Sequence, residues 1–227
     1  LKDGTFAFAV EINEPQYATI SYSRNKTMVY LEPNDTLAIL SDGNSFPHSV
    51  SFSGRGGANN RYVYKYLAEN PKELNPFKKI QYKKGTYWFT LDPEIDQMMK
   101  NNHPEAFKKK MLIKKEKALL DLDFNMANNP GVLSPSFREF MATEIIYDWA
   151  YHVLLYGSVF KNKHGLTESY FSFLDEVPIQ NESVGNYRYR DFLMAYLNFL
   201  VMKNNYQSEY PYLRQYEYAT NLLSVRA

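Results

Sequence analysis

The feature that most constrains the fold of this chain is a change in the spacing of its apolar residues near Gly54–Gly57. Before this point apolar and polar residues alternate over short runs, which is typical of half-buried β-strands. After it, apolar residues recur at every third or fourth position, which is typical of amphipathic helices. A chain of 227 residues can bury a sizeable core without a metal or a disulfide. The sequence therefore predicts a β-rich N-terminal part joined to a larger helical part.

Short strands separated by polar turns are predicted in the β-rich part. They cover residues 6–12, 17–22, 27–31, 36–40 and 50–52. Pro33-Asn34-Asp35 and Asp42-Gly43-Asn44 are strong turn signals, because Pro presets φ and Asn or Asp can close a turn. Strands and turns this closely spaced favour a small antiparallel sandwich. The predicted fold class is α+β, with an antiparallel β-sandwich domain at 1–57 and an α-helical domain at 58–227.

Apolar periodicity and end signals predict a series of helices in the second part. Asp92-Pro93 is a good helix start, His103-Pro104 interrupts the helix that follows, and Gly157 suits the end of another helix. The pattern also allows a strand over 86–90. The predicted helices cover 59–68, 92–103, 104–126, 134–156, 167–175, 189–200 and 211–227.

Composition argues against several functional classes. The 26 basic and 25 acidic side chains give a net charge of +1, whereas a dedicated nucleic-acid binder usually carries a strong basic excess. No apolar run approaches the roughly 18 residues that a membrane-spanning helix needs. Cysteine is absent, which excludes thiol catalysis, disulfides and Cys-ligated metals within these residues.

Tyrosine is frequent, with 20 Tyr against 2 Trp. Exposed rings such as Tyr17, Tyr22, Tyr87 and Trp88 could stack on sugar rings, which is one interpretation of this composition. A core filled with tyrosine is the interpretation that we favour, because alternation places at least half of the aromatic residues in the interior.

Basic residues concentrate in 61–120, which holds 14 Lys or Arg and seven Asp or Glu. Many of these lysines fall on the helix predicted to end near 126, where Phe107, Met111 and Leu122 recur with helical spacing. We favour a solvated helix face over a site for an anionic partner. Nucleic acid is the weaker form of that second interpretation, because no interleaving of Arg and aromatic residues accompanies the lysines.

Glu144, Asp148 and His152 form the polar constellation that most resembles a chemical site. They are spaced i, i+4 and i+8, and so share one stripe of the helix predicted over 134–156. Apolar residues surround most of this helix, which predicts that the helix is buried. Buried polar groups must be paired, so the stripe is expected to meet partners on a neighbouring helix.

Two interpretations of this stripe differ in those partners. The first is a carboxylate–carboxylate–imidazole site for a metal or for proton transfer, as a hydrolase would use. The second is a salt-bridge network to Arg138, Arg188 or Arg190. We favour the network, because structural ion pairs outnumber catalytic ones.

Other catalytic signatures are missing from the sequence. The four histidines follow no metal-binding spacing, and no G-x-S-x-G nucleophile elbow is present. Gly54-Arg55-Gly56-Gly57 follows a predicted strand, as a phosphate loop would, but Asn59 stands where the dinucleotide-binding pattern has its third Gly. A sharp strand-to-helix turn with positive φ is the favoured interpretation.

Two segments resemble a known family. Residues 29–39, VYLEPNDTLAI, are similar to its L-x-P-G-D-S-L hairpin, and residues 50–60, VSFSGRGGANN, to its F-S-G-x-G-A-x-x-N strand-to-helix junction. The family is the N-terminal region of TlpA-like thiol–disulfide oxidoreductases of the Gram-negative cell envelope. In this family a small β-domain precedes a helical segment, and a thioredoxin-like domain with a Cys-x-x-Cys site follows. Asn34 stands where the family usually has Gly, a tolerable change because Asn also accepts left-handed backbone geometry.

The resemblance implies a non-catalytic accessory module. The chain has no cysteine to match Cys-x-x-Cys, so no catalytic, cofactor-binding or metal-binding residue is assigned. The implied partners are a C-terminal thioredoxin-like domain, which the module would position, and envelope proteins. The implied location is the periplasm or the cell envelope, with a lipid anchor on the full-length protein as one form of attachment. We expect Leu1 to mark a processing boundary or the start of a fragment.

Two alternative hypotheses stay open at the level of sequence. A stand-alone envelope module could bind glycan or peptide through a Tyr-rich surface. A hydrolase could use Glu144, Asp148 and His152, and that hypothesis fails if these side chains are sealed in the core and paired with arginines.

Overall fold

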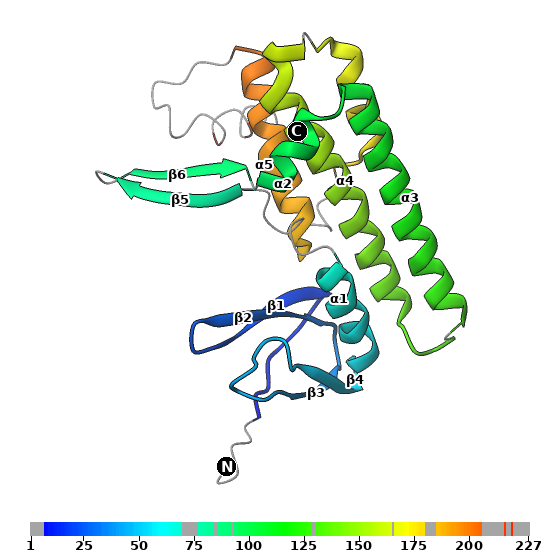
Figure 1. Ribbon diagram of the computed structural model, residues 1–227. Coiled ribbons are helices and arrows are strands. Elements are labelled where there is room, and N and C mark those ends of the chain that lie inside the picture. Colours follow the sequence, from blue (N-terminus) through cyan, green and yellow to red (C-terminus); the bar gives the residue numbers. More distant parts are fainter. Residues whose placement is uncertain are drawn as a thin grey trace. The chain divides into compact units, whose positions relative to one another are not determined.

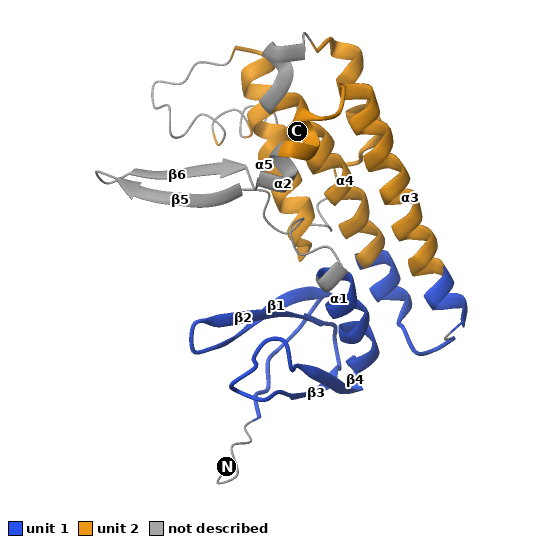
Figure 2. Cartoon of the chain, in the orientation of Figure 1, with its two compact units in different colours: residues 1–71, 124–140 blue, residues 72–123, 141–227 orange. Residues whose placement is uncertain are grey.

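The computed structural model describes most of the chain. The described residues are 7–69, 77–83, 86–91, 93–128, 130–164, 166–179, 185–205, 216 and 219. Two compact units, coloured separately in Figure 2, divide the chain. Unit 1 contains residues 1–71 and 124–140, and unit 2 contains residues 72–123 and 141–227. Helices predominate and strands contribute to both units, which confirms the α+β fold class.

Unit 1 begins with four strands that pair as two antiparallel two-stranded sheets (Figure 1). In the first sheet β1 (Gln16–Tyr22) pairs with β2 (Asn25–Leu31), and in the second β3 (Thr36–Leu40) pairs with β4 (Ser51–Arg55). These strands match four of the predicted ones. Asn34 has φ 66° in the turn after β2, so the left-handed backbone predicted there is confirmed.

The two sheets share one small apolar core. Its buried residues are Val29, Phe46, Val50 and Phe52, with Ala18, Ile20, Leu31, Leu37 and Tyr64 packed against them. Each of these sheets has two strands. The described strands of unit 1 therefore form two small antiparallel sheets around one core.

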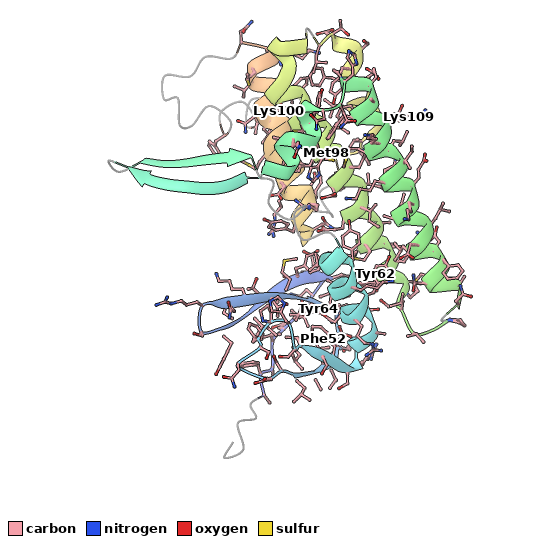
Figure 3. All side chains as sticks on the ribbon, viewed as in Figure 1. Phe52, Tyr62, Tyr64, Met98, Lys100 and Lys109 are labelled. Atoms are coloured by element: carbon pink, nitrogen blue, oxygen red, sulfur yellow. The ribbon has the colours of Figure 1, made fainter. Side chains whose placement is uncertain are left out.

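Helix α1 (Gly57–Glu69) belongs to unit 1 and covers this core. Figure 3 labels Tyr64 on α1 and Phe52 on β4, whose ring centroids lie 6.0 Å apart. The Tyr64 hydroxyl donates to the Pro47 carbonyl at 2.7 Å, and Arg61 Nη1 donates to the Phe52 carbonyl at 2.7 Å. These contacts explain why unit 1 extends beyond residue 57, where the sequence predicts the domain boundary.

The strand predicted over 6–12 is not observed in the described residues. Residues 7–12 adopt no strand, and Phe8 and Val10 are exposed. Alternation supplies only a local preference, whereas a stable strand also needs a partner with which to form a ladder. β2 is the strand that pairs with β1, so the ladder at this end of unit 1 begins at Gln16.

Unit 2 is mainly helical. Its elements are the antiparallel pair β5 (Phe77–Lys83) and β6 (Thr86–Leu91), α2 (Pro93–Lys100), most of α3 (Pro104–Asn128) and α4 (Pro135–His164), the 3-10 helix η1 (Glu168–Glu176), and α5 (Tyr187–Lys203). The interruption predicted at His103-Pro104 separates α2 from α3, and β6 is the strand that the pattern allowed at 86–90. The helix predicted over 211–227 lies outside the described residues, apart from helical positions 216 and 219.

Helix α4 continues past Gly157, where the sequence predicts its end. A Cβ atom on Gly157 would lie 2.5 Å from the Phe171 ring and 3.0 Å from the Tyr170 ring of η1. The glycine therefore permits close packing of η1 on α4 instead of terminating the helix. In the sequence alone, a glycine that ends a helix looks the same as a glycine that makes room for a neighbouring side chain.

Aromatic residues fill the core of unit 2. Phe107 of α3 stacks on Tyr156 of α4 with ring centroids 4.6 Å apart, and Tyr147 of α4 packs edge-on against Tyr189 of α5 at 4.7 Å. These side chains and that of Tyr170 are almost completely buried. The prediction of a tyrosine-filled core is thus confirmed for this unit. Within the described residues, no helix combines the length and hydropathy needed to cross a membrane.

Candidate functional site

The stripe of Glu144, Asp148 and His152 lies along α4 in unit 2. Helical spacing brings the three side chains to one face, and that face meets the first turn of α5, where Arg188 lies. All four side chains belong to residues that are between 1% and 6% exposed. The sequence therefore placed these polar groups correctly in the core.

Arg188 connects the stripe to α5. Its Nε atom lies 2.7 Å from Asp148 Oδ1, and its backbone N–H donates to Glu144 Oε2 at 3.3 Å. The Nη1 atom of the same guanidinium donates to Asp191 Oδ2 at 3.3 Å. Arg188 was one of the three arginines predicted as partners, and this pairing is confirmed. Arg190 is exposed.

His152 completes the stripe. Its Nδ1 atom lies 2.8 Å from the carbonyl oxygen of Asp148 and 3.6 Å from Asp148 Oδ2. A carbonyl only accepts hydrogen bonds, so Nδ1 carries the proton of the neutral ring. Among the described residues the buried Nε2 atom has no hydrogen-bond partner. Burial lowers the pKa of His152, against the opposing effect of Asp148, and the ring is neutral near pH 7.

Glu144 is also held mainly uncharged near neutral pH. Burial raises the pKa of its carboxyl to about 8, although the Arg188 guanidinium opposes this shift. Burial likewise raises the pKa of Asp191. When Glu144 is protonated, two negative charges remain, on Asp148 and Asp191. Two positive charges lie near them, on Arg188 and Lys114. Burial lowers the pKa of Lys114. The cluster is therefore close to charge balance.

This geometry suits a structural ion-pair network better than a catalytic site. A catalytic group must reach a substrate, whereas these side chains are sealed in the core. Among the described residues, no group of three or more His, Asp or Glu side chains could hold a metal ion. Buried charges that are paired and hydrogen-bonded are the usual solution to their loss of hydration. The structure thus favours the salt-bridge interpretation of the stripe over the hydrolase.

A second polar network lies in unit 1, within the two segments that carry the family resemblance. The Asn60 amide of α1 donates from Nδ2 to the Tyr30 carbonyl at 2.8 Å and accepts from the Tyr30 N–H at 2.8 Å. Its Nδ2 atom also donates to the Gly56 carbonyl at 3.0 Å. On its other side Tyr30 lies opposite Tyr17 of β1. The Asn60 side chain thus takes the place of a neighbouring strand along β2 and satisfies both buried backbone groups.

Glu32, just after the hairpin strand β2, is the second hub of this network. Its Oε2 atom accepts hydrogen bonds from Tyr30 Oη at 3.0 Å, Ser134 Oγ at 2.9 Å and Ser136 Oγ at 2.5 Å. Its Oε1 atom accepts from Asn59 Nδ2 at 3.4 Å. Several donors around one carboxylate replace the water that burial removes. The hub joins the hairpin to α1 and to the start of α4 within unit 1.

The glycines of the strand-to-helix junction serve close backbone contacts. Gly54 has φ 79°, and a Cβ atom there would lie 2.3 Å from the Thr36 carbonyl oxygen. Gly56 has φ 86°, and its Cβ atom would lie 2.6 Å from Asp35 Oδ2. That oxygen accepts the Glu32 N–H at 3.1 Å. The sharp turn with positive φ, favoured over a phosphate loop, is confirmed.

The aromatic residues singled out for sugar stacking do not form one described platform. Tyr17 packs edge-on against Phe140 with ring centroids 4.9 Å apart. Tyr22 is exposed and packs against Phe46 at 6.0 Å. The side chains of residues 87 and 88 lie outside the described part of the structure.

The structural roles of three residues in these networks were not predicted from the sequence. Asp191 lies three residues after Arg188, a spacing that signals a helical ion pair. Asn186 caps α5 by accepting the Tyr189 N–H at 3.1 Å, and Asn before a helical pattern is a known cap signal. Asn60 matches the Asn of the junction motif, but its bonds to Tyr30 could not be predicted, because β2 is distant in sequence.

Comparison of the chain with protein-family models, with curated proteins and with solved structures finds no match in any of the three. The sequence motifs and the geometry of the two networks are therefore the observations that bear on function.

Proposed function

We propose that this chain is a non-catalytic scaffold module of an exported, thioredoxin-like thiol–disulfide oxidoreductase of the cell envelope. In this proposal the module positions a C-terminal thioredoxin-like domain or the protein substrates of that domain. The two strand pairs of unit 1 act as the layers of a small β-sandwich. The full-length protein works in the periplasm or at the envelope surface, where a lipid anchor could hold it.

One observation carries the proposal: the residues that resemble the family are engaged in holding unit 1 together. Asn60 bonds the backbone of β2, and Asp35 accepts the N–H of Glu32 across the turn that follows β2. Gly54 lets the Thr36 carbonyl approach closely, and Gly56 does the same for the Asp35 carboxylate. A signature made of such contacts marks a scaffold, because the same side chains are not available to bind or transform a substrate.

The buried cluster of unit 2 and the absence of cysteine support the same conclusion. Asp148 and Arg188 pair with each other in the core, so the polar constellation most like an active site is closed to substrate. Thiol–disulfide exchange needs a thiolate, and the chain contains no Cys. In the proposal, the redox chemistry belongs to cysteines encoded beyond residue 227.

The reading frame after Ala227 gives the first test. We expect it to continue into a domain with a Cys-x-x-Cys motif. A stop codon soon after Ala227, with no such domain, would contradict the proposal and would favour the stand-alone binding module.

Activity of the full-length product gives the second test. We expect it to reduce the disulfides of insulin in the presence of a thiol donor, and we expect replacement of both motif cysteines by serine to abolish the reaction. Asp148→Asn in the same protein is the matched variant, because the two side chains have nearly the same size. It should lower thermal stability but leave turnover at low temperature intact, whereas a loss of turnover in the folded variant would assign a catalytic role to the cluster.

A further inference from the structure

One side of α3 carries an exposed apolar stripe with heptad spacing. Ala106, Ile113 and Leu120 follow one another at intervals of seven residues within unit 2, and all three are exposed. Ile113 is 54% exposed and Leu120 is 69% exposed. An interval of seven residues, close to two helical turns, keeps these side chains on one side of the helix, and the positions that would complete a coiled-coil seam are the charged Lys109, Glu116 and Asp123.

The opposite side of α3 is the one that packs in the core. Phe107, Met111 and Leu122 are buried there, and Phe107 stacks on α4. Figure 3 shows Lys109 on the side of α3 that points away from α4. The apolar stripe is thus distinct from the face that holds α3 in its own unit.

Charged residues flank the stripe in an order that changes sign along the helix. From start to end they are Lys109, Lys110, Glu116, Lys117, Asp121 and Asp123. The first two are basic, the middle two are one of each sign, and the last two are acidic. Lys110 Nζ donates to Asn102 Oδ1 at 2.6 Å within its own chain, which leaves further ammonium protons for another acceptor.

Four of these six residues meet an opposite charge when the order is reversed, whereas Lys109 and Asp121 meet apolar residues. A two-fold axis between Glu116 and Lys117 places Ile113 opposite Leu120 of a second copy. The same axis places Glu116 opposite Lys117 and Lys110 opposite Asp123, and each of these pairs occurs twice. A parallel arrangement would instead bring Lys117 against Lys117. Self-complementary contacts of this kind are the mark of an isologous dimer interface.

We propose that this face of α3 binds the same face of a second copy of the chain, antiparallel, to form a two-fold symmetric dimer. The proposal is independent of the scaffold function, since it uses different residues and a different measurement. One helix from each copy buries less than the roughly 800 Å² per partner of a standard interface. The dimer is therefore weak and reversible.

Sedimentation of the full chain tests the dimer. From about 10 μM to about 500 μM, a range suited to weak complexes, the mean mass should rise toward that of a dimer. Ile113→Glu places a charge in the seam and should weaken association by at least about tenfold. Met194→Glu is the matched control, because Met194 of α5 is also 54% exposed but lies outside the stripe, and it should dimerise like the natural chain.

A charge exchange tests the pairing across the axis. Glu116→Lys alone places two lysines opposite each other twice and should weaken the dimer. Adding Lys117→Glu to the same chain restores opposite charges across the axis and should restore association. Loss without recovery would contradict the antiparallel register, because a general effect on folding would not be reversed by the second substitution.

Cross-linking tests the register directly, because the natural chain has no Cys. A mixture of Ile113→Cys and Leu120→Cys chains should form a disulfide-linked heterodimer on mild oxidation. Each variant alone should not, since seven residues of helix separate its two cysteines by about 10 Å, beyond the roughly 7 Å that a disulfide allows between Cα atoms. Self-linking of the single variants without the mixed product would overturn the register.

Three outcomes would overturn the dimer itself. The chain could stay monomeric over the whole range, or dimerise equally well with Ile113→Glu. A monomeric chain could instead sediment with anionic phosphatidylserine vesicles and lose this binding with Ile113→Glu, which would assign the face to a lipid surface. Each of these results would mean that the apolar stripe of α3 does not bind a second copy of the chain.

Discussion

In unit 1 the hydrogen bonds that fasten α1 to β2 come from a neutral amide, whereas in unit 2 the contacts that fasten α5 to α4 come from charged groups. Asn60 satisfies the backbone of Tyr30 without any charge. Arg188 pairs with Asp148 and also donates its backbone N–H to Glu144. Loss of a neutral partner leaves an unsatisfied polar group, whereas loss of a charged partner leaves a buried charge, which costs more.

This difference predicts different responses of the two units to mutation and to pH. Both tryptophans, Trp88 and Trp149, belong to unit 2, so Trp fluorescence follows the unfolding of that unit. Hydrogen exchange of peptides that cover β2 follows unit 1. Separate probes are needed because a chain with two units need not unfold in one step.

The largest effect is expected from Arg188→Met in unit 2. The substitution keeps an apolar stem but leaves the Asp148 carboxylate buried without its partner, and we expect the free energy of unfolding to fall by about 3–5 kcal/mol. Urea unfolding followed by Trp fluorescence measures it. The control is Arg190→Met, which is exposed in the same turn and should change stability by less than about 0.5 kcal/mol.

A double variant sharpens this result. Arg188→Met together with Asp148→Leu removes both charges, and it should recover part of the loss because no unpaired charge remains. A loss below about 1 kcal/mol for Arg188→Met alone would mean that the pair is not buried as described.

The next largest effect is expected from Gly54→Ala in unit 1. Gly54 and Gly131 have similar positive φ angles, 79° and 76° respectively. At Gly54 an added Cβ atom would clash with the Thr36 carbonyl, whereas at Gly131 it would meet nothing within 4 Å. Gly131→Ala should cost about 1 kcal/mol from the left-handed backbone alone, and Gly54→Ala about 3 kcal/mol with the added clash. Hydrogen exchange of β2 measures both. Equal costs would show that the contact with Thr36 is not close.

A smaller effect is expected from Asn60→Ala in the same unit. The variant leaves the N–H and carbonyl of Tyr30 without their partner on that edge, and it should cost about 2 kcal/mol. Exchange of the Tyr30 amide should quicken first. Asn44→Ala is the control, because Asn44 is exposed in a turn of the same unit, and an equal effect of the two variants would be incompatible with the bonding of Asn60.

The smallest effect is expected from the titration of Glu144, measured as the change in the free energy of unfolding for each unit of pH. Its folded-state pKa of about 8 lies above its ordinary value of 4.5. The folded state therefore binds more protons between these values, and its stability declines as the pH rises through that window. Glu144→Gln cannot ionise, so the stability of the natural chain relative to this variant should fall by about 1 kcal/mol per pH unit.

Urea unfolding at intervals from about pH 5 to pH 8, followed by Trp fluorescence, measures this difference. The lowered pKa of His152 has the opposite sign, since its contribution is lost as the pH falls below 6.5. Both proteins share that contribution and it cancels in the comparison. Parallel profiles for the natural chain and Glu144→Gln would show that Glu144 does not titrate in this window.

The sequence predicted features that depend on near neighbours along the chain. The β2 and β3 strands, the helix break at His103-Pro104 and the stripe of Glu144, Asp148 and His152 all follow from short-range spacing. Features that depend on distant contacts were missed or misread. Gly157 looks like a helix end until Phe171 is known to lie against it. The strand predicted over 6–12 fails for the same reason, because alternation says nothing about whether a partner strand is near.

The candidate site shows the same division. Polarity on an apolar helix predicted that the stripe is buried and paired, and Arg188 was among the partners proposed. The choice of Arg188 over Arg190 could not be predicted, because it depends on which side of α5 faces α4. The uncharged state of Glu144 also required the structure, since burial of the whole residue raises its pKa.

Turnover by the purified 227-residue chain is the most direct test of the claim that it is a scaffold. Hydrolysis of a panel of ester, peptide and glycoside substrates should be measured with the purified chain, because the absence of Cys already excludes thiol–disulfide exchange. We predict no rate above that of buffer alone for the 227-residue chain. A rate above that background, removed by His152→Ala or Asp148→Asn in a chain that is still folded, would contradict it.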